Sequence, residues 1–224
     1  MSNSDARGAA PTDGARGFSL YAPRSGARKY LNRPERLRVL AAMRQLPADE
    51  ALFALTLAWT GARVSEALSL TPASFQVESG IVSIRTLKRR RATVRELPIS
   101  PALMAALEQH FGICAAQRAG AVDHRLWPWS RATAWRRIKR VMNLSGVAGP
   151  QACPRGLRHG FAVGVLQAGI PLTLAQRWLG HARLSTTAIY ADVSGPEEAE
   201  LAARFWRSYP PENVMPLAMV SKTR

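Results

Sequence analysis

Four residues in the last third of the chain could together carry out chemistry at a phosphodiester. Tyr190 follows a segment with Arg158, His159 and His181, and the gaps are 23 residues (181 − 158) and 9 residues (190 − 181). A tyrosine hydroxyl can attack phosphorus only if the phosphate charge is neutralised, and arginine binds phosphate oxygens bidentately without losing its charge. Because a free phenol titrates near pH ~10, the attack also needs help with its proton, for which His181 is the natural candidate.

An upstream segment, residues 60–66 with the sequence TGARVSE, adds Arg63 and Glu66 to this set. Glu66 follows Arg63 by three residues and can pair with it and hold its guanidinium, although an ordinary exposed helix salt bridge is the alternative. An isolated tyrosine after a helix is usually a packing residue, and a single arginine or histidine would carry little weight. The spacing of the whole set favours one shared site.

In their order and spacing these motifs resemble those of the tyrosine recombinase, or phage integrase, family, from about residue 30 to about residue 207. Arg63 in TGARVSE matches the first catalytic arginine of the family, and Arg158 in GLRH matches the second. His181 in LGH matches the histidine of the third motif, and Tyr190 matches the nucleophile. The resemblance implies an α+β, mainly α-helical catalytic-domain fold with a small antiparallel β-sheet or hairpin at one edge.

A basic segment, residues 85–91, joins two expected strands at 81–84 and 93–97 and would form the tip of a hairpin. Lys88 is a lysine among arginines there, and a lysine can give up its proton whereas arginine cannot. The family has a catalytic lysine in this hairpin, so the resemblance implies that role for Lys88. The cations beside it are expected to seek DNA phosphates; they are Arg89, Arg90 and Arg91.

Two features depart from the family pattern. The family commonly has a histidine three residues before the second arginine, where this chain has Arg155. Arginine can donate to a phosphate oxygen but cannot act as a base, so a proton acceptor there is missing or is replaced by His181, His159 or water, and we expect slower chemistry rather than none. Family members also usually carry a separate helical DNA-binding domain first, which an accessory DNA-binding protein would have to replace here.

The elements that must position these residues can be predicted from caps, glycines and apolar spacing. Asn32 before Pro34 predicts a helix that stops near Pro47, and a second helix over about 50–60 should end at Gly61, so that Arg63 begins a short helix. Further helices are expected over residues 101–111, 131–143, 157–168, 172–179 and 197–206. His181 would then lie just beyond a helix end at Gly180, where the helix dipole favours its protonated form.

The predicted helix 131–143 has Trp135, Ile138 and Met142 on one face and cations on the rest, with no acidic residue. A solvated amphipathic helix is the ordinary alternative, but this charge pattern favours a helix that faces DNA. The residues assigned to DNA binding here are Arg131, Arg136, Arg137, Lys139 and Arg140, and His159 is added to the same set.

The composition of the chain is typical of a protein that binds a polyanion. Lys and Arg exceed Asp and Glu by 16 (31 − 15), and the pI is about 11.4. Ribosomal and histone-like proteins share that bias, but they seldom have 47% hydrophobic residues and six tryptophans. Two cysteines imply no disulfide framework, and neither a membrane-spanning run nor a signal-peptide core occurs. We therefore expect a cytoplasmic, bacterial, nucleoid-associated protein with a flexible basic arm (1–29), a catalytic domain (30–207) and a tail (208–224).

The resemblance implies a site-specific recombinase that acts on double-stranded DNA as a homo-oligomer, a tetramer on synapsed DNA. The resemblance implies that Tyr190 forms a 3′-phosphotyrosyl link and frees a 5′-hydroxyl. Because this ester conserves the energy of the broken phosphodiester bond, neither ATP, a metal nor another cofactor is needed. The supporting roles are neutralisation of charge by Arg63 and Arg158, phosphate hydrogen bonds from His181 and Arg155, and protonation of the leaving oxygen by Lys88. The alternatives are DNA relaxation like that of a type IB topoisomerase, or a catalytically weak or inactive DNA-binding accessory protein.

Overall fold

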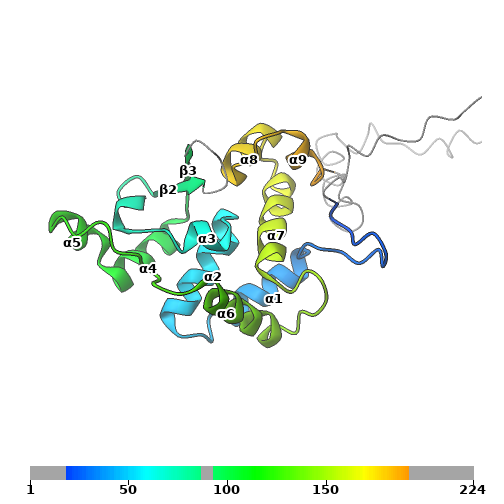
Figure 1. Ribbon diagram of the computed structural model, residues 1–224, viewed down its shortest axis with the longest axis horizontal. Helices are drawn as coiled ribbons and strands as arrows, with labels where there is room; N and C mark the ends of the chain where they lie inside the picture. The colour runs from blue at the N-terminus through cyan, green and yellow to red at the C-terminus, as the bar shows by residue number, and fades with distance from the viewer. Residues whose placement is uncertain (1–18, 87–92, 192–224) are drawn as a thin grey trace, which may run out of the picture.

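The protein is represented by a computed structural model, and its structure is described over residues 19–86 and 93–191 (Figure 1). Lys88 and the three arginines after it lie outside the described residues, as do the helix expected over 197–206 and the proposed tail. Within the described part, helices dominate and one small antiparallel sheet lies at an edge, which confirms the expected fold class.

Long helices form the body of the domain. Their bounds are α1 Arg33–Met43, α2 Ala48–Thr60, α4 Pro101–Phe111, α6 Arg131–Leu144 and α7 Pro154–Gln167. Helix α2 packs against both α4 and α7, and α7 runs through the middle of the view in Figure 1. The shorter helices are α3 Val64–Ala67, α5 Ile113–Arg118, α8 Leu172–Leu179 and α9 Ser185–Ala188, together with the 3₁₀ turn η1 Pro72–Ser74. None of the described helices is long and apolar enough to cross a lipid bilayer.

Helix ends follow the local signals in the sequence. Asn32 caps α1 in a capping box with Glu35, and Ser130 caps α6 through a bond from the Thr133 amide. Helix α7 begins at Pro154, three residues before the predicted start, because proline is well suited to a first helical turn whose amide would have no partner. Gly61 ends α2 with a φ of 61°, so the chain turns sharply toward Arg63.

The sheet has the order β1-β2-β3, with bounds β1 Phe75–Gln76, β2 Ile81–Thr86 and β3 Thr93–Pro98. The pairing of β2 with β3 is antiparallel from Ile81↔Pro98 to Thr86↔Thr93, which confirms the predicted hairpin; β1 was not predicted. Alternation along β3 turns Arg95 and Leu97 inward while their neighbours are exposed. An arginine therefore occupies a position where the strand pattern normally places an apolar side chain.

Two hydrophobic clusters stabilise the fold. The larger contains Phe53 and the fully buried Trp127, whose rings meet edge to face at 5.3 Å, and the Trp127 indole donates to the Asp49 carbonyl at 3.0 Å. The smaller cluster includes Tyr190 and Leu179, so the candidate nucleophile is also a packing residue.

The N-terminal stretch differs from the expected flexible arm over residues 19–29. Leu20 is buried in the smaller cluster with Tyr190, and Tyr21 and Arg28 form an isolated antiparallel bridge. Arg28 also pairs with the capping residue Glu35 at 2.9 Å. Apolar contacts with residues far away in the sequence hold this stretch in place. Such contacts produce no periodic apolar pattern in so short a segment, so the sequence did not predict them.

Candidate active site

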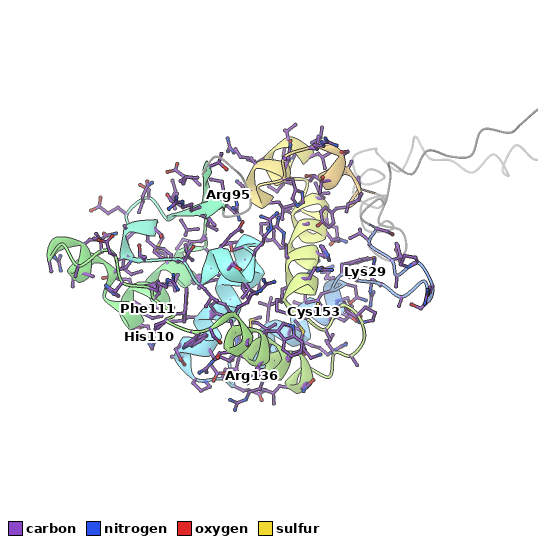
Figure 2. The ribbon with its side chains drawn as sticks, viewed as in Figure 1. Lys29, Arg95, His110, Phe111, Arg136 and Cys153 are labelled. Carbon is purple, nitrogen blue, oxygen red and sulfur yellow. The ribbon has the colours of Figure 1, made fainter. Side chains whose placement is uncertain are left out.

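One cleft of about 750 Å³ brings the matched residues together. Helices α3, α6, α7 and α9, with the segment before α1, contribute its walls. The predicted catalytic residues that line it are Arg63, Arg155, Arg158, His181 and Tyr190. Lys29 and Cys153 also line it, and Figure 2 labels both beside α7. Within residues 19–86 and 93–191, no three His, Cys, Asp or Glu side chains are grouped so that they could bind a metal ion.

Arg158 is fixed by two helix ends. Its side chain is 7% exposed, and its guanidinium donates to the Gly61 carbonyl at 2.5 Å and to the Leu179 carbonyl at 2.6 Å. These carbonyls lie at the C-terminal ends of α2 and α8, where the helix dipoles are negative. Burial, together with the charge of Arg63, lowers the pKa of Arg158 to about 10, so it remains a cation at neutral pH.

Arg63 is held by Glu66, as the spacing suggested, but the pair is not an ordinary exposed salt bridge. The Glu66 carboxylate is 1% exposed; it accepts from the Arg63 guanidinium at 2.7 Å and from the Arg63 amide at 2.9 Å. Burial alone would raise the pKa of Glu66, but the hydrogen bond and charge of Arg95, with those of Arg63, outweigh it and lower the pKa. The guanidinium of Arg63 is thus preoriented at the cleft wall.

Arg95 is a residue that the sequence reasoning missed. Its guanidinium donates to the Glu66 carboxylate at 2.6 Å, and also to the Thr86 hydroxyl at 3.1 Å and the Trp178 carbonyl at 2.7 Å. Figure 2 shows it between the hairpin and α3. It therefore connects β2, β3, α3 and α8, and fixes the end of the β2–β3 pair at Thr86. The sequence did contain a signal for this residue: in the alternating pattern of β3, Arg95 falls on the same side as Leu97, which faces the core.

Tyr190 meets His159 in the interior of the site. The Nδ1 atom of His159 lies 2.9 Å from the Tyr190 hydroxyl oxygen, and the two residues are only 3% and 2% exposed. Burial raises the pKa of Tyr190 to about 12, although Arg158 and Arg63 oppose the shift. The prediction that His159 contacts DNA does not fit this geometry, because so buried a ring presents almost no surface to a duplex.

His181 has a different relation to Tyr190. Its ring is stacked on the Tyr190 ring, with centroids 6.2 Å apart and an interplanar angle of 11°, and its Nδ1 atom lies 2.9 Å from the Thr187 hydroxyl. Burial, followed by the charges of Arg158, Arg63 and Arg95, lowers the pKa of His181 to about 3. The expectation of a protonated His181 is therefore wrong: desolvation and three nearby cations outweigh the helix dipole at Gly180.

The basic helix α6 only partly matches the predicted DNA-facing surface. Arg131 and Trp135 line the cleft, and Trp135 is 48% exposed, whereas Ile138 and Met142 on the predicted common face are fully buried. Arg136 is exposed on the helix surface, where Figure 2 labels it. The cations at the N-terminal end of the helix thus remain available to a polyanion beside the catalytic residues.

Three of the predicted DNA-binding cations on α6 have partners outside the helix, and Arg136 donates to the Thr133 hydroxyl within it at 3.4 Å. Arg137 forms an ion pair with the buried Glu50 and lies 4.1 Å from the centroid of the Trp129 ring. Arg140 is 3.7 Å from the same carboxylate, and Lys139 donates to the Ala152 carbonyl at 2.9 Å. The acid that pairs with Arg137 comes from α2, 87 residues away in the chain, so a helix pattern alone could not reveal it.

The two histidines of the site predict that the domain loses stability in mild acid. Burial and neighbouring cations lower the pKa of His159 and of His181 from 6.5 to about 3. Below about pH 6.5 the unfolded chain binds protons that the folded chain excludes, so this stability is fully present above pH 6.5 and is lost as the pH falls toward 3. For His159 we expect the unfolding free energy to drop by about 1.4 kcal/mol per pH unit, with a smaller share from the half-buried His181.

Urea unfolding at about pH 7, 6 and 5 measures this slope. His159→Asn should reduce it, and His124→Asn, at an exposed position, should leave it unchanged. Equal slopes in all three proteins would contradict the assignment of the acid sensitivity to the buried ring.

Comparisons with known proteins agree with the geometry. The model of the phage integrase family matches residues 29–196. The chain is similar to tyrosine recombinase XerC of Roseiflexus castenholzii, with 32% identity over 170 residues, covering 72% of this chain and 49% of the relative. It is also similar to XerC of Rhizobium meliloti, with 32% identity over 195 residues, covering 81% and 58%. The chain thus spans about half the length of such curated relatives.

Solved structures show the same fold. The XerH site-specific recombinase bound to its difH substrate superposes with a TM-score of 0.63 at 24% identity, covering 84% of this chain and 55% of that one. The catalytic domain of bacteriophage HP1 integrase gives 0.57 at 23% identity, covering 79% and 94%. The second match covers nearly the whole of the solved HP1 domain, so the two proteins share the fold over that length.

Proposed function

The chain belongs to the phage integrase family of tyrosine recombinases, and from this premise we propose that it cuts and rejoins DNA at a specific site through a 3′-phosphotyrosyl intermediate. One observation carries the proposal: the Tyr190 hydroxyl and the guanidinium groups of Arg63 and Arg158 share one cleft. A nucleophile beside two fixed cations is the arrangement that attack on a phosphodiester needs.

The two arginines would bind the scissile phosphate. A guanidinium has five N–H donors, and the bonds from Arg158 to the Gly61 and Leu179 carbonyls use two of them. Arg158 can therefore bind a phosphate oxygen while it stays fixed. Arg63 is oriented by Glu66 in the same way. Donors that are already in place need no reorganisation when charge develops on the phosphate oxygens.

The chemistry would proceed by in-line exchange of esters. The Tyr190 oxygen forms a bond to phosphorus as the bond from phosphorus to the 5′ oxygen breaks, and the 5′ oxygen takes up a proton. We propose Lys88 as the donor of that proton, and Arg155 and His181 as further hydrogen-bond donors to the phosphate. The reverse reaction with a new 5′-hydroxyl rejoins the strand, so the ester supplies the energy for ligation.

Double-stranded DNA is the proposed partner, which is supported by the net charge of +16 and by the structurally similar XerH in complex with its DNA substrate. We also propose that the chain acts as a homo-tetramer on synapsed DNA in the bacterial cytoplasm. Arg155, in place of the usual histidine, is the observation that favours the second candidate, a DNA-binding protein with weak or no catalysis.

Covalent capture in a bacterial host tests the proposal. Cells that express the wild type are denatured, and DNA that remains attached to the protein is sequenced. Attachment at discrete ends supports site-specific cleavage, and the ends identify the site. Attachment at scattered positions, with plasmid relaxation but no recombinants, supports topoisomerase-like activity instead. Tight DNA binding without any attachment supports the non-catalytic candidate.

A further inference from the structure

The hydrogen bond between His159 and Tyr190 joins the candidate nucleophile to a titratable ring. The distance from Nδ1 to the hydroxyl oxygen is 2.9 Å, and the ring centroids are 5.8 Å apart at 45°. This distance is within the range over which a general base can take a proton directly. Because His159 immediately follows Arg158 on α7, the same helix that fixes the phosphate-binding guanidinium also fixes the imidazole.

Other groups that line the cleft are less suited to accept this proton. Arg155 is a permanent cation, and Lys29 donates its ammonium to the Ser19 carbonyl at 3.2 Å. The Cys153 thiol is 3.4 Å from the Pro150 carbonyl. His181 presents the face of its ring to Tyr190, and its Nδ1 atom is engaged with Thr187. His159 alone among these has a described hydrogen bond to the hydroxyl.

The surroundings of His159 keep the ring neutral before the substrate binds. Burial lowers its pKa to about 3, with contributions from Arg158, Arg155, His181 and Lys29. A neutral imidazole has one nitrogen that accepts, so Nδ1 can accept from the phenol if Nε2 has the proton. A bound phosphate would offset the charges of Arg158 and Arg155, which raises the affinity of the ring for a proton at the stage when Tyr190 releases one.

We infer that His159 is the general base of this site: Nδ1 takes the proton of the Tyr190 hydroxyl as the phenol oxygen bonds to phosphorus. The inference rests on the proposed function. The P–O5′ bond breaks in the same step and the 5′ oxygen receives its proton from a separate acid, so protons and charges balance. During rejoining, the imidazolium returns its proton to the phenol oxygen. His159, which lies on α7 one turn after Arg155, thereby supplies the base that Arg155 cannot provide.

The tautomer of His159 gives a first test that needs no DNA. Long-range ¹H–¹⁵N NMR distinguishes protonated from unprotonated ring nitrogens, and the signals that disappear in His159→Asn belong to this ring. We expect a neutral ring with an unprotonated Nδ1. A proton on Nδ1 would mean that the ring donates to the phenol oxygen, and the inference would be overturned.

Cleavage kinetics give the second test, with DNA duplexes that carry the ends recovered by covalent capture. In His159→Asn, the amide oxygen takes the place of Nδ1 and can accept the hydrogen bond from Tyr190, but it cannot take up the proton. This variant therefore distinguishes a residue that only positions Tyr190 from one that accepts its proton. We expect His159→Asn and His159→Ala to slow adduct formation alike, by roughly 10²- to 10⁴-fold. The exposed control His124→Asn should react at the wild-type rate, and thermal melts and DNA binding confirm that each variant is folded.

A duplex with sulfur in place of the scissile 5′ oxygen shows whether a variant has lost a general base or a general acid. A thiolate leaves without a proton, so this substrate compensates for loss of an acid but not for loss of a base. The defect of His159→Asn should therefore persist on it. Two results would overturn the inference while the proposed function stands. One is a near wild-type rate of cleavage by His159→Asn on the oxygen substrate, and the other is a return of its cleavage rate to the wild-type value on the sulfur substrate. Failure of the wild type to form any adduct would overturn both.

Discussion

Tyr190→Phe is expected to abolish covalent attachment of DNA while DNA binding persists. The substitution removes one oxygen, which is the proposed nucleophile, and keeps the ring that packs with Leu179 and stacks on His181. Loss of the hydrogen bond to His159 should destabilise the fold by only about 1–3 kcal/mol. The effect on adduct formation should be complete, because no substitute atom in the phenylalanine can attack phosphorus.

Denaturing gels with end-labelled DNA measure the adduct, and mobility shifts measure binding. Tyr21→Phe is a matched control, since Tyr21 packs against the same cluster but lies outside the cleft lining. Equal adduct formation by Tyr190→Phe and the wild type would reject Tyr190 as the nucleophile. A loss of adduct in Tyr21→Phe as well would indicate damage to the cluster rather than to the chemistry.

Arg158→Lys is expected to have the second largest effect, on both catalysis and stability. Lysine keeps the charge but is a compact ammonium that cannot span the Gly61 and Leu179 carbonyls as the planar guanidinium does. Loss of a preorganised donor at the phosphate should slow cleavage by roughly 10²- to 10³-fold. A buried carbonyl left without its donor should also cost about 1–3 kcal/mol of unfolding free energy.

Single-turnover cleavage and urea unfolding measure these two effects separately. Arg44→Lys, at an exposed position at the end of α1, is the control and should change neither quantity. If Arg158→Lys were destabilised but cleaved DNA as fast as the wild type, then Arg158 would serve only to hold α2, α7 and α8 together. Slow cleavage with unchanged stability would instead show that the carbonyl contacts contribute little to folding.

Much of the fold could be predicted because the relevant rules act over a few residues. The capping box at Asn32 and the left-handed glycines at Gly61 and Gly180 lie where the sequence placed them. Gly61 is required twice over: its φ is +61°, and a Cβ there would lie 2.4 Å from a ring carbon of Phe161. The matched motifs also lie in one cleft, as their order indicated.

Predictions failed where partners come from distant parts of the chain. Glu50 binds Arg137 across 87 residues, so a helix without acids of its own still has an ion pair with an acid from another helix. Trp135 shares a helical face with Ile138 but remains half exposed, because that end of the face borders the cleft rather than the core. Helical periodicity shows which residues share a face and does not show what covers it.

The sequence by itself determined the family, the order of the elements and the residues that could bind and attack a phosphate. Only the tertiary structure decided how they are connected: Arg95 reaches Glu66 across 29 residues, and His159 reaches the hydroxyl of Tyr190 across 31. It also decided that His181 is neutral rather than protonated. The physical reason is that caps and turns depend on neighbouring backbone atoms, whereas burial and electrostatic interactions depend on which distant groups the folded chain brings within a few ångströms.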